Sequence, residues 1–251
     1  MSPWAEMWVG SVVSGLAKAA VPADAGPMAA YMRHQFRFLG VKAPAQKAVF
    51  RSALAAAGPP TGDGDVVAAV DALWARPERE HRYVGCQLAG RLASEAPPDF
   101  LGDVARWITT DPWWDTCDPL ARSCVGQVVR HHPALRSTID CWLEGDDLWL
   151  TRAAITHMGG WKEAIDREWV FAACLVRAGH QDFFVRKAIG WILRDLAWVD
   201  PDAVVAFVDG PGAPVLSGLS KREALKNVTR SRQDETENSL LGVVDLATCR
   251  S

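Results

Sequence analysis

The sequence lacks the long apolar runs typical of a membrane protein and the paired cysteines typical of a disulfide-stabilised protein. No stretch approaches the roughly 18 to 20 uncharged apolar residues that a membrane-spanning helix needs. The longest apolar run near the N-terminus, from Val9 to Val21, is interrupted by serine, glycine and lysine. The six cysteines form no Cys-x-x-Cys pair, and 251 residues are enough to bury a core without disulfide bonds. We therefore expect a soluble, cytoplasmic protein with reduced cysteines.

Clustered metal ligands and tyrosines are also scarce. The adjacent histidines His131 and His132 precede Pro133 without a carboxylate or cysteine at ligand spacing, so we predict no metal site and no cofactor. The chain has 2 tyrosines against 12 tryptophans. Most of the tryptophans should pack in the core, because large aromatic side chains dominate burial, while a minority could face a ligand.

Strand patterns are nearly absent, whereas apolar spacings of three and four residues recur along the chain. Proline and glycine separate the segments that show this helical spacing. The sequence thus predicts an all-α fold. Its expected helices include Asp65–Trp74, Glu78–Leu92, Pro98–Ile108, Pro119–His131, Leu148–His157, Asp166–Arg177, Phe183–Trp198 and Ser220–Thr229.

An internal period of 35 residues runs through the chain. Helix pairs that repeat every 33 to 47 residues or so are typical of α-solenoids. We predict an α-solenoid of about six HEAT-like repeats that forms a curved superhelix with a concave face. Residues 1–230 would form one domain and residues 231–251 a polar tail. The period is marked by basic residues at Lys47, Arg82, Arg152, Lys187 and Arg222.

One basic residue per repeat allows two interpretations. A stripe of cations would suit a polyanion, because each cation that meets a phosphate releases counterions. Alternatively, each cation pairs with a carboxylate of the neighbouring repeat, and the net charge of −3 favours this view.

The period is broken at Cys117, which is followed by Asp118 where the next two repeats have Ala153 and Ala188. Since the residue before a proline is biased away from helical geometry, we expect Asp118 in or just before a first helical turn, with Asp115 as the N-cap. Both acids could simply complement the helix dipole.

A second hypothesis assigns Asp118 to a functional group. Trp114 lies four residues before Asp118, and Trp191 lies four residues after Lys187, so each pair should share one side of its helix. We predict that Trp114, Asp118, Arg152 and Trp191 meet on the concave face. Indole faces attract cationic frameworks, a carboxylate stabilises positive charge at a sugar C1, and arginine binds phosphate. These parts suit hydrolysis of an N-glycosidic bond in a nucleic acid whose leaving base is electron-poor.

At these residues the sequence resembles the AlkD-type DNA alkylation-repair family, which are DNA glycosylases built of HEAT-like repeats. The resemblance covers about Pro27 to Thr229 in six blocks. These blocks are Tyr31-Met32 with Phe36 to Val41 and Pro44; Leu73-Trp74 with Pro77 to Glu80; Trp113 to Asp115 with Asp118; Leu148 to Leu150 with Arg152, Ala154 and Ile155; Phe183-Phe184 with Lys187 to Trp191, Leu193 and Arg194; and Leu219 to Ala224.

The resemblance implies specific roles. It makes Asp118 the catalytic residue, places Trp114 and Trp191 against the deoxyribose at the lesion, and assigns backbone phosphate to Arg152. The remaining cations expected to bind phosphate are Lys47, Lys187, Arg194 and Arg222. The implied reaction removes cationic N3- or N7-alkylpurines, such as 3-methyladenine and 7-methylguanine, from duplex DNA. It leaves an abasic site and proceeds without base flipping, in contrast to most glycosylases.

Two departures keep alternatives open. Members of this family are usually more basic, so a non-catalytic DNA-binding repeat protein or a protein-interaction scaffold remains an alternative. Excision of bulky N3-adenine adducts is a variant of the main hypothesis. The segment from Val208 to Gly218 is interpreted as an insertion before the last repeat. We expect a monomer that acts on double-stranded DNA, at the nucleoid, without contacting a membrane.

Overall fold

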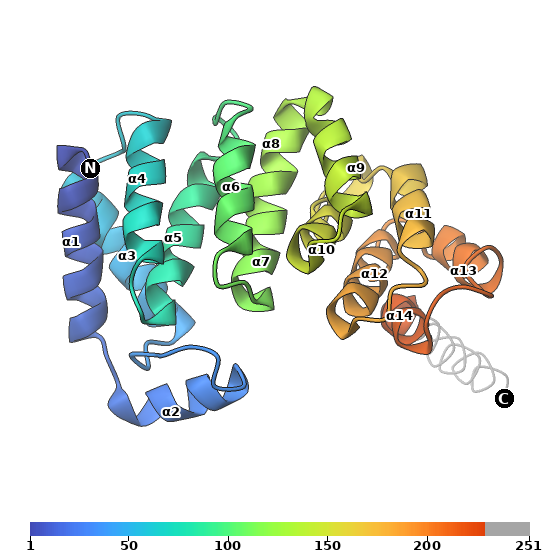
Figure 1. Cartoon of the computed structure of the whole chain (residues 1–251), viewed down its shortest axis with the longest axis horizontal. Coiled ribbons are helices and arrows are strands. Elements are labelled where there is room, and N and C mark those ends of the chain that lie inside the picture. Colours follow the sequence, from blue (N-terminus) through green and yellow to red (C-terminus); the bar gives the residue numbers. More distant parts are fainter. Residues whose placement is uncertain (229–251) are drawn as a thin grey trace, which may run out of the picture. The chain divides into compact units, whose positions relative to one another are not determined.

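The computed structural model describes residues 1–228, so Thr229 and the predicted tail lie outside the described residues. Within residues 1–228 the regular structure is helical, apart from one isolated β-bridge between Arg37 and Glu78. The predicted all-α class is confirmed (Figure 1). Over the same residues, no helix combines the length and the apolar character that crossing a bilayer requires.

The 35-residue period corresponds to a repeat of helix pairs. The second helices of the pairs are α3 (Ala43–Ala57), α5 (Arg79–Leu92), α7 (Trp114–Leu120), α10 (Leu148–Thr156), α12 (Phe183–Leu196) and α14 (Gly218–Ala224), and their first residues are 34 to 36 residues apart. The first helices are α1 (Pro3–Lys18), α4 (Asp63–Trp74), α6 (Phe100–Thr109), α9 (Arg136–Glu144), α11 (Arg167–Val176) and α13 (Pro201–Asp209). Such pairs are typical of an α-solenoid.

Two compact units make up the chain, one from Met1 to Ser137 and one from Thr138 onward. The boundary falls within α9. The single domain over residues 1–230 and its superhelical curvature stay predictions.

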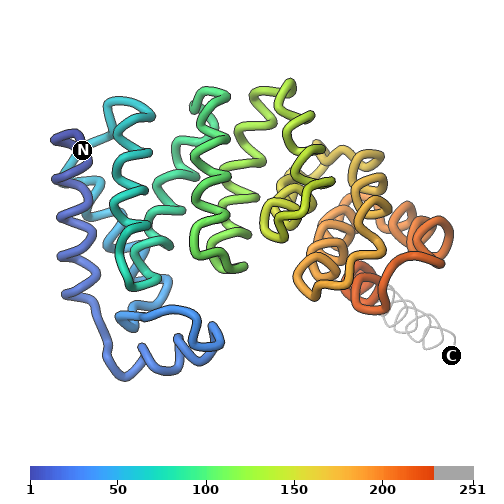
Figure 2. The backbone as a smooth tube through the Cα atoms, viewed as in Figure 1, coloured from blue at the N-terminus to red at the C-terminus, as the bar shows by residue number. Residues whose placement is uncertain are grey.

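In the first unit, one helix departs from the pair pattern. The short helix α2 (Pro22–Tyr31) is inserted between α1 and α3 and runs across the direction of α1, as Figure 2 shows. The loop after α2 is held by Glu80, whose carboxylate is fully buried and accepts the backbone N–H groups of Leu39, Gly40 and Val41 at 2.9 to 3.0 Å. A buried charge needs such partners, so Glu80 fixes this loop on α5.

In the second unit, helix α12 packs closely on helix α14 at Gly190. A Cβ atom on Gly190 would lie 2.4 Å from the Cβ of Glu223, so only glycine lets α12 approach α14 this closely.

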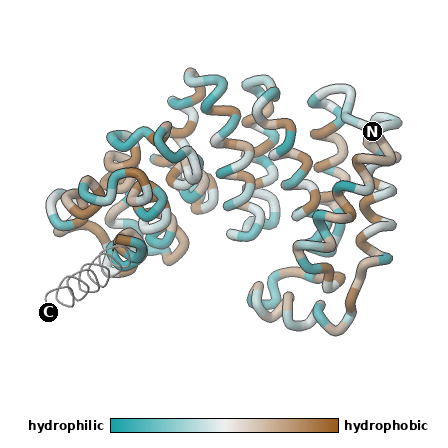
Figure 3. The backbone as a smooth tube through the Cα atoms, turned by 180° about the vertical axis from the view of Figure 1, so that it is seen from behind, coloured by the Kyte–Doolittle hydropathy of each residue, from teal (hydrophilic) through white to brown (hydrophobic). Residues whose placement is uncertain are grey.

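Apolar and polar positions alternate around the helices in Figure 3, as amphipathic packing requires. Aspartate or serine side chains cap the N-termini of α10 to α14, at Asp147, Asp166, Asp182, Asp200 and Ser217.

The helix predicted from Pro119 to His131 begins earlier. Helix α7 starts at Trp114, continues through Pro119 into a π-helical turn at Ala121–Val125 (η1), and ends in α8 (Gly126–His131). Proline lacks an N–H and crowds the carbonyl four residues earlier, and the wider turn follows directly after it. The expectation that Asp118 lies in or before a first turn is therefore wrong, because four helical residues precede it.

Candidate functional site

The residues predicted to act at the lesion in the first unit lie on α7. Trp114 and Asp118 are both helical and partly exposed, and their spacing of four places them on one side of α7. The ring of Tyr31, at the end of α2, meets the Trp114 indole edge-on, with centroids 5.9 Å apart. Helix α2 therefore contributes an aromatic wall beside Trp114.

Asp115 does not cap α7. The N-cap residue is Trp113, which provides no side-chain cap hydrogen bond. The carboxylate of Asp115 instead receives Nε and Nη2 of Arg79 at 3.0 and 2.7 Å, with both side chains at most 4% exposed. A bidentate arginine pair provides stronger, charge-assisted hydrogen bonds than a backbone N–H, which explains why the capping prediction is wrong.

Arg79 holds the start of α7 through several further contacts. Its guanidinium donates to the backbone oxygen of Asp111 at 3.0 Å and to Oγ1 of Thr116 at 2.9 Å. The ring of Phe36 covers its other face, 3.7 Å from Cζ to the centroid. These contacts connect Arg79 to residues before and after Trp114, so they fix the turn in which α7 begins.

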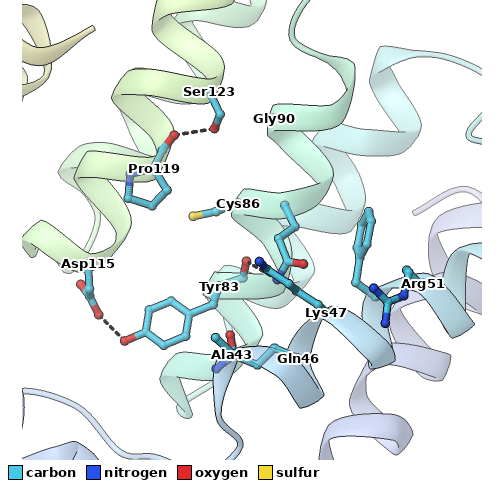
Figure 4. A pocket seen from close by; sticks show the side chains of 12 residues that line it. Ala43, Gln46, Lys47, Arg51, Tyr83, Cys86, Gly90, Asp115, Pro119 and Ser123 are labelled. Carbon is cyan, nitrogen blue, oxygen red and sulfur yellow. Dashed lines mark hydrogen bonds between the residues drawn. The ribbon is translucent and has the colours of Figure 1, made fainter. Parts of the chain in front are cut away.

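Tyr83 completes this cluster. Its hydroxyl donates to Asp115 at 2.5 Å, as Figure 4 shows. Burial, together with the negative charge and hydrogen bond of Asp115, raises the pKa of Tyr83 far above that of a free tyrosine. The phenol is thus a permanent donor. We refer to Arg79, Tyr83 and Asp115 as the α7 anchor.

Two pockets of the first unit lie on either side of the α7 anchor. The pocket in Figure 4 has a volume of about 570 Å³ between α3, α5 and α7, with the exposed Lys47 among its lining residues. The other pocket, of about 550 Å³, is lined by α2 and includes Tyr31 and Trp114. The wall that both pockets share consists of Ala43, Gln46, Tyr83 and Asp115.

In the second unit, Trp191 is surrounded by cations. The guanidinium of Arg152 lies 5.0 Å from the indole centroid, Nζ of Lys187 at 5.9 Å and the guanidinium of Arg194 at 5.8 Å. Cations at such distances are attracted by the negative face of an indole. This arrangement gathers three of the predicted phosphate-binding residues around one of the predicted lesion-contacting tryptophans.

Glu223 of α14 pairs with two of these cations. Its Oε1 lies 2.7 Å from Nζ of Lys187, and its Oε2 lies 3.1 Å from Nη1 of Arg194. Burial raises the pKa of Glu223, but the hydrogen bond and charge of Lys187, with the charges of Lys226 and Arg194, outweigh it, so the net pKa is lowered. The carboxylate is therefore ionised at neutral pH.

The periodic basic residues differ in their surroundings: some pair with carboxylates, as the second interpretation expects, and the binding of a polyanion by the others stays a prediction. Arg82 is paired with Asp111 at 2.6 Å, and Lys187 with Glu223. Arg152 is 1% exposed, and its Nη1 donates to the backbone oxygen of Phe184 at 2.6 Å. In this arrangement Arg152 supports Trp191, and its phosphate contact stays a prediction. Lys47 and Arg222 are exposed.

The structure brings the predicted residues together in two pairs. Trp114 and Asp118 share α7, and Arg152 lies against Trp191 in the second unit. A meeting of these pairs on one surface stays a prediction. Sequence reasoning missed the α7 anchor and Glu223. One available signal was Arg79, which lies three residues before a periodic basic residue, where the last four repeats have the large apolar residues Trp114, Trp149, Phe184 and Leu219. Arg79 is thus a charged residue at an otherwise apolar position, and it is 1% exposed.

No group of three or more histidine, cysteine or acidic side chains that could hold a metal ion occurs in the described part of the chain.

Comparison with known proteins agrees with the all-helical repeat architecture. A family model described as DNA alkylation repair enzyme matches residues 12–228. The solved structure of a predicted DNA alkylation repair enzyme from Enterococcus faecalis has a TM-score of 0.74 and 27% identity, and the match covers 82% of this chain and 95% of that one. A search of curated proteins found no match.

Helix-pair repeat proteins of this kind form a class in which successive units carry the functional surface. The chain belongs to the DNA alkylation repair enzyme family, since the family model spans most of its length.

Proposed function

We propose that the protein is a DNA glycosylase that hydrolyses the N-glycosidic bond of cationic N3- or N7-alkylpurines in duplex DNA. The observation that carries the proposal is the pair formed by Trp114 and Asp118 on one side of α7, a helix whose start is held by the α7 anchor. A carboxylate on a rigid element suits catalysis, because a functional group must stay in a productive geometry.

The proposed mechanism uses the charge that alkylation places on the base. When the bond from C1′ to the purine nitrogen breaks, its electron pair neutralises the cationic purine, so the leaving base needs no general acid. Positive charge then develops at C1′, where the Asp118 carboxylate stabilises it and helps to orient water. Water adds at C1′ and loses a proton, which leaves an abasic site.

The other predicted residues bind DNA in this proposal. Trp114 and Trp191 contact the deoxyribose at the lesion, and Arg152, Lys187, Arg194, Arg222 and Lys47 contact backbone phosphates. The base stays stacked, so the enzyme recognises the lesion through its sugar and charge rather than in a pocket for an extruded base. The proposed enzyme works as a monomer without a cofactor.

Release of 7-methylguanine from methylated duplex DNA under single-turnover conditions tests the proposal. We expect release by the wild type and a loss of at least about 100-fold for Asp118→Asn, because the neutral amide cannot stabilise charge at C1′. The matched control is Asp63→Asn, which removes the same charge from the exposed first turn of α4. It should release the base at the wild-type rate.

The alternatives make different predictions in the same assay. A non-catalytic DNA-binding protein would bind the duplex with a steep salt dependence and leave the alkylated base in place. A protein scaffold would not bind duplex DNA even at low salt. Either result, or undiminished release by Asp118→Asn, contradicts the proposal.

A further inference from the structure

Glu223 occupies a position between two cations that DNA phosphates are proposed to bind. Lys187 and Arg194 lie two helical turns apart on α12, with Trp191 between them. The two oxygens of Glu223 divide between these side chains, one for each, at 2.7 and 3.1 Å. A carboxylate that spans two cations fixes both, and long flexible side chains lose rotamer freedom only when something holds them.

The packing of α12 on α14 is adapted to this bridge. Gly190 leaves the space that the Cβ of Glu223 fills, and the backbone oxygen of Ser220 would lie 2.9 Å from any Cβ at position 190. The Oγ of Ser220 in turn donates to the backbone oxygen of Arg186 at 2.9 Å. These contacts fix the position of Glu223 along the axis of α12, so that its carboxylate lies between Lys187 and Arg194.

The charge of Glu223 also affects how strongly the cluster attracts phosphate. Four cations face Glu223 or Trp191 in this cluster, namely Arg152, Lys187, Arg194 and Lys226, and the carboxylate of Glu223 pairs with two of them, Lys187 and Arg194. Glu223 therefore lowers the positive potential that a phosphate would meet, while it holds two of the cations beside the indole. Glu223 thus weakens the attraction of phosphate to the cluster, but it keeps Lys187 and Arg194 in a defined position.

We propose that Glu223 is a positioning residue, which holds Lys187 and Arg194 on the two sides of Trp191 and weakens phosphate binding as a consequence. This inference rests on the proposed function, because it assigns the two cations to DNA. It adds a residue that acts through its neighbours rather than on the reacting atoms.

The test is Glu223→Gln, which keeps the shape and a hydrogen-bonding side chain but removes the charge. We expect binding to undamaged duplex DNA to tighten by about 3- to 10-fold at low salt, because a nearby negative charge is lost. Single-turnover release of 7-methylguanine should slow by about 10- to 100-fold, because small misplacements of positioning groups are costly. Thermal unfolding of both proteins verifies the fold.

Two further variants separate charge from position. Glu223→Asp keeps the charge but is one methylene shorter and cannot span both cations, so binding should stay within about 2-fold of wild type while release slows. Glu144→Gln removes one charge from the exposed end of α9 in the same unit. It should change neither binding nor release by more than about 2-fold, since its side chain is exposed on another helix and solvent weakens the interactions of exposed charges.

The outcomes discriminate clearly. Weaker binding together with slower release by Glu223→Gln indicates a purely structural role and overturns the inference, as does unchanged release. Equal tightening by Glu144→Gln overturns it too. The binding measurements use undamaged DNA and need no catalysis. If the wild type binds DNA but releases no base, the proposed glycosylase activity fails while the predicted effect of Glu223 on binding is still tested.

Discussion

At the scale of single residues, the site depends on how buried charges are paired. The sequence identified Trp114 and Asp118 from a break in its period, and the spacing of four residues was enough to place them on one side of a helix. The pairing of Asp115 with Arg79 could not be predicted, because it joins residues 36 positions apart and competes with an equally plausible N-cap. Only the three-dimensional arrangement decides between a local partner and a distant one.

Replacing Tyr83 with phenylalanine tests the α7 anchor. The change removes one hydrogen bond to the buried carboxylate of Asp115, so we expect the free energy of unfolding to fall by about 1.5–3 kcal/mol in urea denaturation. The control is the other tyrosine of the chain, Tyr31, whose side chain is 72% exposed. Tyr31→Phe should stay within about 0.5 kcal/mol of wild type, and an equal loss in both variants would contradict the special role of Tyr83.

At the scale of elements, apolar spacing together with the proline and glycine breaks predicted the starts of seven of the eight expected helices to within two residues, because each helix buries one apolar face. The helix predicted from Pro119 to His131 was the exception. Rules for proline place it in the first turn, yet here α7 starts at Trp114, where the α7 anchor holds the turn, and a π-helical turn follows. Long-range contacts therefore overrode the local preference that the sequence displays.

The close approach of α12 and α14 can be tested by substituting Gly190. Gly190→Ala places a Cβ 2.4 Å from that of Glu223, so we expect overpacking to lower the free energy of unfolding by about 1–3 kcal/mol. A matched change is Gly102→Ala in α6, where nothing lies within 4 Å of the added Cβ. That variant should be neutral or more stable by up to about 1 kcal/mol, since alanine favours helix. Equal behaviour of the two variants in denaturant would contradict the packing argument.

At the scale of the whole molecule, a net charge of −3 must be reconciled with a DNA substrate. The structure shows how cations and anions are distributed: Arg82 and Lys187 are neutralised by partners, whereas Lys47 and Arg222 are exposed. Composition could not reveal this, because it counts charges without their neighbours. The number of cations available to phosphates is therefore smaller than the sequence period suggests.

The salt dependence of binding to an undamaged duplex measures that number. With contacts from Lys47 and Arg222 alone the slope of log K against log salt concentration would be about −2, and with all five proposed cations about −4.5. We expect a value between these limits in a fluorescence anisotropy titration at several salt concentrations, because Glu223 already compensates part of the charge of Lys187 and Arg194. The double variant with Lys47 and Arg222 replaced by glutamine should lose about 2 units of slope. A slope near zero contradicts the proposed interface.

The wall shared by the two pockets of the first unit has a consequence for inhibition. Tyr83 and Asp115 line both cavities, and the phenol of Tyr83 is hydrogen-bonded to the carboxylate that Arg79 holds. A small molecule that wedges into either cavity and displaces Tyr83 would disturb the start of α7, and it would also contact Lys47 or Trp114, which line the two cavities. Such a compound would reduce both DNA binding and base release, and Tyr83→Ala, which removes the displaced side chain, would abolish the effect that acts through α7.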